Sequence, residues 1–206
     1  MFGLFKKKTD FISSEENFWN WFLNHKSKIE KFIDSEHADY SIYNELTSKI
    51  KSYNNLLFPE LTKTSDNKYV LIITPDGMKE GVAPTKKLAE GHPEIKNWVI
   101  EKFRQPSDQI TLNFKGLEFP TSDIEIMPQI DEEGEKVNIN VFIKNMNTDE
   151  EKYKSLAFLY LDHILGEFNT ITKVGYIDFQ NLEKGKNIEG SISLLELRNL
   201  IAQELY

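Results

Sequence analysis

The chain contains no cysteine among its 206 residues. Disulfide bonds, thiolate metal sites and cysteine nucleophiles are therefore excluded. Histidine is also scarce, with four in the whole chain, so a site built from several imidazole ligands has few candidate residues. A sequence without cysteine suits a reducing compartment, and we expect the protein to be cytoplasmic.

Long apolar runs are absent as well. None approaches the roughly 20 consecutive residues that a membrane-spanning helix needs, so no membrane span is expected. The segment 1–12 begins with a short apolar patch that is followed by Lys6, Lys7 and Lys8. A signal peptide has the opposite order, with its charges first. We expect a flexible N-terminal tail, and the alternative is a short anchor at a membrane surface.

Basic residues are outnumbered, since 25 Lys and Arg face 33 Asp and Glu, which gives a net charge of -8. Nucleic-acid binding needs a basic face, so no nucleic-acid partner is expected. The phosphate-loop, dinucleotide and nucleophile-elbow motifs are missing, and no cofactor is expected. These absences favour a non-enzymatic module that binds another protein. One hypothesis within this class is an inhibitor or immunity-type role toward a basic partner, which the net charge and the aromatic-rich first predicted helix suggest. Nothing in the sequence indicates the oligomeric state.

Residues 13–61 have the pattern of a helical hairpin. Large apolar side chains recur at helical spacing in the first helix, which ends near Asp34, and Ser13 or Ser14 can cap its start. A second helix is predicted over residues 40–57, where apolar residues alternate at spacings of three and four. Pro59 ends it, and residues 62–68 read as a polar linker.

Residues 62–206 alternate between strand and helix patterns, and we expect one α+β domain that is compact with the hairpin. Helices are predicted near 82–91, 148–169 and 193–206. Most strands show alternating apolar residues, which is typical of antiparallel sheets with one wet face. The fold class is therefore α+β, with an N-terminal helical hairpin followed by a mostly antiparallel sheet with packed helices. The expected strands lie near 69–73, 98–103, 109–119, 124–130, 137–143 and 170–179.

One polar group stands out in the apolar stretch "LYLDHILGEFNTI" (159–171). His163 and Glu167 are four residues apart and share a helix face, so with Asp162 they could bind a divalent metal or act as an oriented general base. Asp178 in a following strand is a further ligand candidate. This set would support a metal-dependent hydrolase. The alternative is a helix end, where a histidine near the C-terminus and its pairing with Glu167 are stabilising.

Trp98 and Arg104 are candidate binding residues. Trp98 follows a loop that contains His92 and Glu94, and it is either part of a recognition surface or a core residue. Arg104 lies at a strand end, where it could hold an anionic group or form a surface salt bridge. A further hypothesis places a small-ligand pocket between the sheet and the hairpin, with Trp19 and Trp98 in its walls.

Two pairs of segments resemble a family of bacterial proteins of unknown function. They are "YVLIITPDG" with "HPEIKNWVIEKFRQP", and "LDHILGEFN" with "VGYIDF", so the resemblance covers about residues 68 to 180. It implies a bacterial source and a single α+β domain. Because that family has no assigned activity, the resemblance transfers no catalytic residue.

Overall fold

A computed structural model describes residues 13–35, 39–108, 110–131, 135–146, 149–183 and 185–205. The predicted tail (1–12) and the tip of the turn "DEEGE" (132–134) lie outside these ranges. In chain order the elements are α1 (Ser14–Asp34), α2 (Ser41–Tyr53), β1 (Phe58–Lys63), β2 (Tyr69–Thr74), the 3-10 turn η1 (Lys79–Gly81), α3 (Val82–Glu90), β3 (Trp98–Lys102), η2 (Thr121–Asp123), β4 (Ile124–Asp131), β5 (Lys136–Lys144), α4 (Glu150–Leu165), α5 (Glu167–Lys173), β6 (Val174–Leu182) and α6 (Leu194–Glu204).

The predicted α+β class is confirmed, but the strands form two sheets of three, in the orders β1-β2-β3 and β4-β5-β6. Each sheet joins one antiparallel and one parallel pair. The expected mostly antiparallel sheet is therefore wrong in this respect, because two of the four strand pairs are parallel. The parallel pairs arise because α3 separates β2 from β3, and α4 with α5 separates β5 from β6, as crossover helices require.

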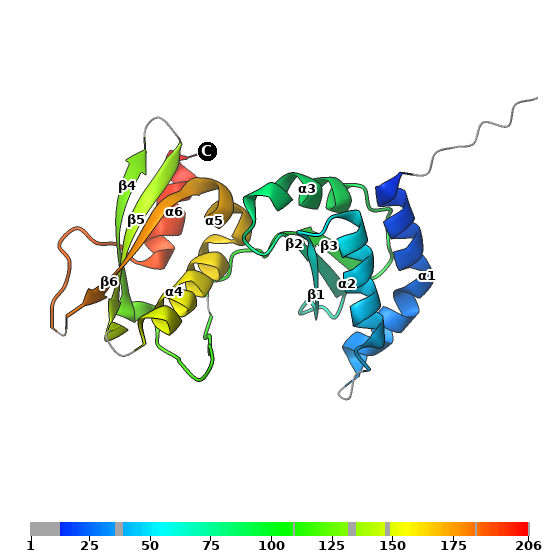
Figure 1. Ribbon diagram of the computed structural model, residues 1–206, viewed down its shortest axis with the longest axis horizontal. Helices are drawn as coiled ribbons and strands as arrows, with labels where there is room; N and C mark the ends of the chain where they lie inside the picture. The colour runs from blue at the N-terminus through cyan, green and yellow to red at the C-terminus, as the bar shows by residue number, and fades with distance from the viewer. Residues whose placement is uncertain are drawn as a thin grey trace, which may run out of the picture.

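Each sheet has its own hydrophobic core, and Figure 1 shows the two units side by side along the long axis. In the first unit, α1, α2 and α3 cover one face of β1-β2-β3, with Phe22 and Leu71 fully buried. In the second unit, α4 and α6 cover one face of β4-β5-β6 around Tyr160 and Val141. The units meet where the chain leaves β3 and where α4 gives way to α5 (Figure 1).

Capping accounts for the sharp helix starts. The hydroxyls of Ser13 and Ser193 each accept a hydrogen bond from the backbone of the third helical residue, and the side chains of Glu16 and Glu196 accept one from the cap backbone amide. Gly166 ends α4 with a φ of +82°, and a Cβ there would lie 3.0 Å from Pro106 Cδ. The predicted single helix over 148–169 is therefore split, because the chain turns at Gly166 against Pro106.

One predicted strand is absent from the structure, and one observed strand was not predicted. Residues 110–119 run as an irregular segment, with an isolated bridge between Phe114 and Leu117 as their strand-like contact. Ile110, Leu112 and Phe114 still pack against the second core, so alternation here reflects burial without strand pairing. Conversely, β1 (Phe58–Lys63) lies where the end of the predicted hairpin (13–61) and the start of the predicted linker (62–68) were expected. Pro59 is tolerated there because β1 is an edge strand.

Candidate functional site

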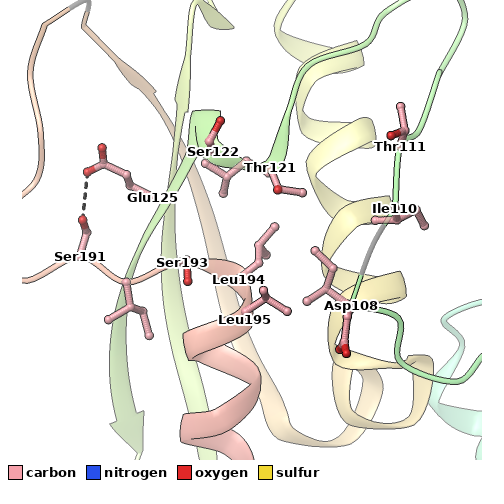
Figure 2. A pocket seen from close by; sticks show the side chains of 13 residues that line it. Asp108, Ile110, Thr111, Thr121, Ser122, Glu125, Ser191, Ser193, Leu194 and Leu195 are labelled. Atoms are coloured by element: carbon pink, nitrogen blue, oxygen red, sulfur yellow. Dashed lines mark hydrogen bonds between the residues drawn. The ribbon is translucent and has the colours of Figure 1, made fainter.

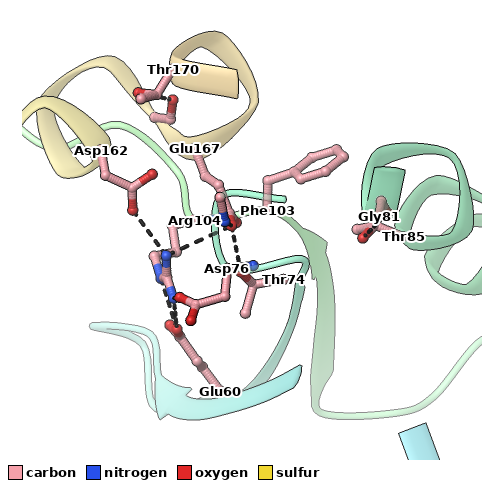
Figure 3. Close-up of polar contacts among 12 residues, drawn as sticks. Glu60, Thr74, Asp76, Gly81, Thr85, Phe103, Arg104, Asp162, Glu167 and Thr170 are labelled. Atoms are coloured by element: carbon pink, nitrogen blue, oxygen red, sulfur yellow. Dashed lines mark hydrogen bonds and ion pairs between the residues drawn. The ribbon is translucent and has the colours of Figure 1, made fainter. Parts of the chain in front are cut away.

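Arg104 lies at the junction of the two units, where four carboxylates surround it (Figure 3). Its guanidinium reaches Glu60 of β1 and Asp76 after β2, each at 2.7 Å. From the second unit, Asp162 of α4 accepts a hydrogen bond from Nη1 at 3.0 Å, and Glu167 of α5 lies 3.7 Å from the same nitrogen. The arginine therefore ties the first sheet to the α4–α5 junction of the second unit.

Glu167 is fully buried, with 0% of its surface exposed. Its Oε1 accepts hydrogen bonds from Thr74 Oγ1 at 2.6 Å and from the Gly77 amide at 3.0 Å. Its Oε2 accepts one from the Arg104 amide at 3.1 Å, and its own amide donates to the Arg104 carbonyl at 3.0 Å. A buried carboxylate needs such partners because burial removes its hydration. The second unit thus inserts an anion into the end of the first sheet.

Burial and charge act in opposite directions on this cluster. Burial alone lowers the pKa of Arg104, but the hydrogen bond with Asp76 and the charge of Glu60 outweigh it, so the net shift is upward. Burial raises the pKa of Asp162, and the neighbouring Glu167 adds to that effect, while Arg104 opposes it without cancelling it. Arg104 therefore stays cationic, and Asp162 holds its proton to a higher pH than an exposed aspartate.

The proposed metal ligands are not assembled as a set. Asp162 and Glu167 converge on Arg104, whereas Asp178 lies in β6 and accepts a hydrogen bond from Gln180 at 2.8 Å. His163 is half-buried in the last turn of α4, where its carbonyl accepts from the Ser107 amide. Within the described ranges, no group of three or more His, Cys, Asp or Glu is arranged to hold a metal ion.

Trp98 lies in the first core. Its ring packs edge-on to Phe22 at 5.0 Å, and its Nε1 donates to Glu30 at 2.9 Å. Trp19 is buried beside it and donates from Nε1 to the Leu88 carbonyl at 2.9 Å. The two tryptophans thus fill the space between sheet and hairpin where a ligand pocket was expected. The core interpretation of Trp98 holds.

The sequence reasoning missed Glu60, Thr74 and Asp76, although one signal was present. Asp76 follows β2 and Arg104 follows β3, and these strands are parallel. Residues that follow parallel strands meet at one edge of the sheet, so recognising the crossover would have brought Asp76 to Arg104.

The second sheet has one face that none of the described helices covers. Its helices all pack on the face of Ile126, Val141 and the other core residues. The centre of the opposite face is formed by nine side chains in three rows across the strands, none of them buried, and Asp131, Lys136 and Lys144 lie at its ends. The rows are Glu125, Phe142 and Gln180; Met127, Asn140 and Asp178; and Gln129, Asn138 and Tyr176. We call these nine residues the open sheet face.

The open sheet face is uneven. A hollow of about 200 Å³ lies between Met127, Asn140 and Tyr176, and Tyr176 is 67% exposed beside it. The strand β6 pairs with β5 along one edge, and no described strand pairs with its other edge. The face therefore combines an exposed aromatic ring, a small depression and a strand edge on which no described strand pairs.

A larger cavity of about 650 Å³ lies beside the start of β4, between the segment around Thr121 and the start of α6 (Figure 2). Hydroxyl groups of Ser193 and Thr121 and the side chains of Leu194 and Leu195 line it. Glu125 lines it too, and its Oε2 accepts from Ser191 Oγ and the Ile188 amide, each at 2.9 Å. That carboxylate is therefore committed to holding the segment after β6.

No family model and no curated protein matches this chain. The resemblance to a bacterial family thus stays a prediction. No helix among the described residues is long and apolar enough to cross a membrane.

Proposed function

We propose that this protein is a non-enzymatic, cytoplasmic binding module that docks a basic partner protein on the open sheet face. The observation that supports the proposal is the composition of that face. Exposed aromatic and methionine side chains are enriched in the buried centres of protein interfaces. Here Tyr176, Phe142 and Met127 are interspersed with amides that can pair with a partner backbone.

Charge supports a basic partner. The chain has a net charge of -8, and Asp178 lies within the open sheet face. Charge complementarity raises association rates and disfavours acidic competitors. The free edge of β6 adds a second binding element, since an extended segment of the partner can pair with it as a fourth strand. An inhibitor or immunity-type role fits this arrangement.

The hydrolase alternative has weaker support. Asp162 and Glu167, which would be its ligands or bases, both contact Arg104 at the unit junction. Glu167 is fully buried, so a substrate could not reach its carboxylate without a rearrangement of the junction. We therefore assign these carboxylates to the assembly of the two units.

Two tyrosines with similar exposure allow a matched test. Tyr176 lies on the open sheet face and is 67% exposed, whereas Tyr40 lies on the first unit and is 63% exposed. A photo-crosslinking amino acid is placed at either position in cells. We expect a discrete crosslinked protein of basic composition from position 176 and not from position 40.

Tyr176→Arg and Tyr40→Arg then test the surface itself with the crosslinked protein in purified form. We expect Tyr176→Arg to weaken binding at least about tenfold, because a buried aromatic contact is lost and a like charge faces the basic partner. Tyr40→Arg should leave binding unchanged. Equal binding by both variants, or an acidic partner, would overturn the proposal.

A further inference from the structure

A second cavity, of about 410 Å³, lies between the two units beside the Arg104 cluster. Three separate segments form its walls. The first wall is Lys86 of α3. The second is the segment 102–106, which begins at the last residue of β3, and the third is the segment 165–169 at the α4–α5 junction. Small-molecule sites are commonly found at such boundaries and in this range of volume.

Two aromatic rings from different units form the apolar part of the wall. The centroids of Phe103 and Phe168 are 5.2 Å apart, with their planes tilted by 42°. Phe103 is 3% exposed and Leu165 is fully buried, so the apolar surface that a ligand can reach belongs to Phe168 and Pro106. A flat apolar group can therefore lie against Phe168, whose ring the buried Phe103 supports from the other unit.

The charges of the lining residues all have one sign. Lys86 and Lys102 line the cavity with their positive charges, and none of its lining residues is a carboxylate, although the chain as a whole is acidic. Arg104 lines it too, but its guanidinium is turned toward the carboxylate cluster. The Arg104 guanidinium is held by Glu60 and Asp76, and Lys102 pairs with Glu90.

Lys86 differs from the other two cations. Its Nζ lies 4.3 Å from the Phe168 ring centroid. Among the described residues no carboxylate lies within ion-pair distance of it, although its charge helps to lower the pKa of Glu90, which is paired with Lys102. Its ammonium group therefore has hydrogen-bond donors available to an incoming anion, right above an aromatic wall.

Phe103 adds an independent sign of specialisation. Its φ is +66°, a conformation that is strained for a bulky side chain. Its amide donates to the Ile73 carbonyl at 3.0 Å, and the strained turn sends its ring and the Arg104 guanidinium to opposite sides (Figure 3). Such strain persists where the surroundings enforce it and is common at ligand sites.

We infer that this cavity binds a small organic anion with a flat apolar body, such as an aromatic carboxylate. The anionic group pairs with Lys86 and, at the rim, with Lys102. The apolar body lies against Phe168 and Pro106, with the buried Phe103 ring supporting Phe168. Because the walls come from both units, the bound anion holds the units together. This inference is independent of the open sheet face.

Naphthoate, its neutral amide naphthamide, and inorganic phosphate form a suitable set of probes for titration calorimetry. We expect saturable binding of naphthoate by the intact chain. The amide lacks the charge and phosphate lacks the apolar body, so each should bind at least about tenfold more weakly. Equal affinity for naphthoate and naphthamide, or no saturable binding of naphthoate, would sink the inference.

Two lysine variants locate the site. Lys86→Met keeps the apolar stem and removes the charge, and Lys96→Met is the control at an exposed position outside the cavity wall. We expect Lys86→Met to weaken naphthoate binding at least about tenfold. Lys96→Met should bind as the wild type does, with both variants folded by circular dichroism. An equal response of the two variants would place the anion elsewhere and overturn the assignment.

Discussion

Glu167 is a carboxylate that water does not reach, and its environment contains donors only. Thr74, Gly77 and Arg104 all donate to it. The sequence indicated Glu167 as a polar residue within an apolar stretch. It did not indicate the partners of Glu167, because two of them lie about 90 residues away and meet it through tertiary packing.

Replacing Glu167 with glutamine should therefore destabilise the protein strongly. The amide nitrogen cannot accept a hydrogen bond, so one buried donor loses its acceptor and Arg104 loses a charge partner. We expect the free energy of unfolding to fall by about 3 kcal/mol in urea titrations. Glu189→Gln, at an exposed position of the same unit, is the control. A loss equal to that of the control would mean that the Glu167 contacts do not stabilise the fold.

Asp162 should behave in the opposite way. Because its pKa is raised in the folded state, the folded protein holds a proton that the unfolded chain releases. Its contribution to stability is complete below the ordinary aspartate pKa and is lost as pH rises through the raised value. Asp162→Asn cannot ionise and keeps an acceptor for Arg104.

The stability of Asp162→Asn relative to the wild type should consequently increase as pH rises from 3 to 7. Thermal unfolding of both proteins across this range measures the difference. A variant that becomes relatively less stable toward neutral pH would show that Arg104 attraction outweighs the burial of Asp162.

The helices of the first unit are joined by a contact that local pattern did not indicate. Glu15 in the first turn of α1 accepts a hydrogen bond from Tyr53 of α2 at 3.0 Å and pairs with Lys87 of α3 at 2.7 Å. The hydrogen bond with Lys87 is the main reason that the pKa of Glu15 falls to about 2. Burial, together with Glu15, raises the pKa of Tyr53 to about 12.

Glu15→Gln tests this contact through pH. The lowered pKa means that Glu15 stabilises the fold above about pH 4.5 and that this contribution disappears as pH falls toward 2. Lys87 is largely exposed, so solvent screening limits the effect to about 1 kcal/mol at pH 7. Urea titrations of the variant and the wild type should converge at the acid end. A constant difference at all pH values would assign the loss to packing instead.

Elements with a strong local signal could be predicted from the sequence, and those that depend on a distant partner could not. The capped helices α1 and α6 begin at Ser14 and Leu194, as Ser13 and Ser193 indicate. The strand β1 was missed because its pairing with β2 overrides Pro59 and the charged residues. Residues 110–119 alternate as a strand does, yet no other described segment pairs with them, and their isolated bridge joins Phe114 to Leu117 within the segment. Of the candidate site, Asp162 and Glu167 were predicted together as metal ligands and Arg104 separately as a binding residue. Their convergence on Arg104 depends on the crossover topology, which was not predicted from the sequence.

The two units share one plan that the sequence does not display as a repeat. Each contains an antiparallel pair, a helical crossover and a third strand that is parallel to the second. Each also has its own core, so both can be expected to retain structure separately. Arg104 contacts carboxylates of both units, and this makes it the natural point at which their folding is coupled.

Arg104→Met should uncouple the units. All three tryptophans, Trp19, Trp21 and Trp98, lie in the first unit, so their fluorescence reports on that unit, whereas far-ultraviolet circular dichroism reports on both. In the wild type we expect the two signals to change together in urea.

Removing Arg104 leaves the buried side chains of Asp162 and Glu167 without their cation. The free energy of unfolding of the second unit should fall by about 3 kcal/mol, so the two unfolding curves should separate. Arg198→Met, which removes a surface pair with Asp108 inside the second unit, should leave the curves together. Coincident curves for Arg104→Met would show that the apolar contact between Phe103 and Phe168 is enough to couple the units without the charge cluster.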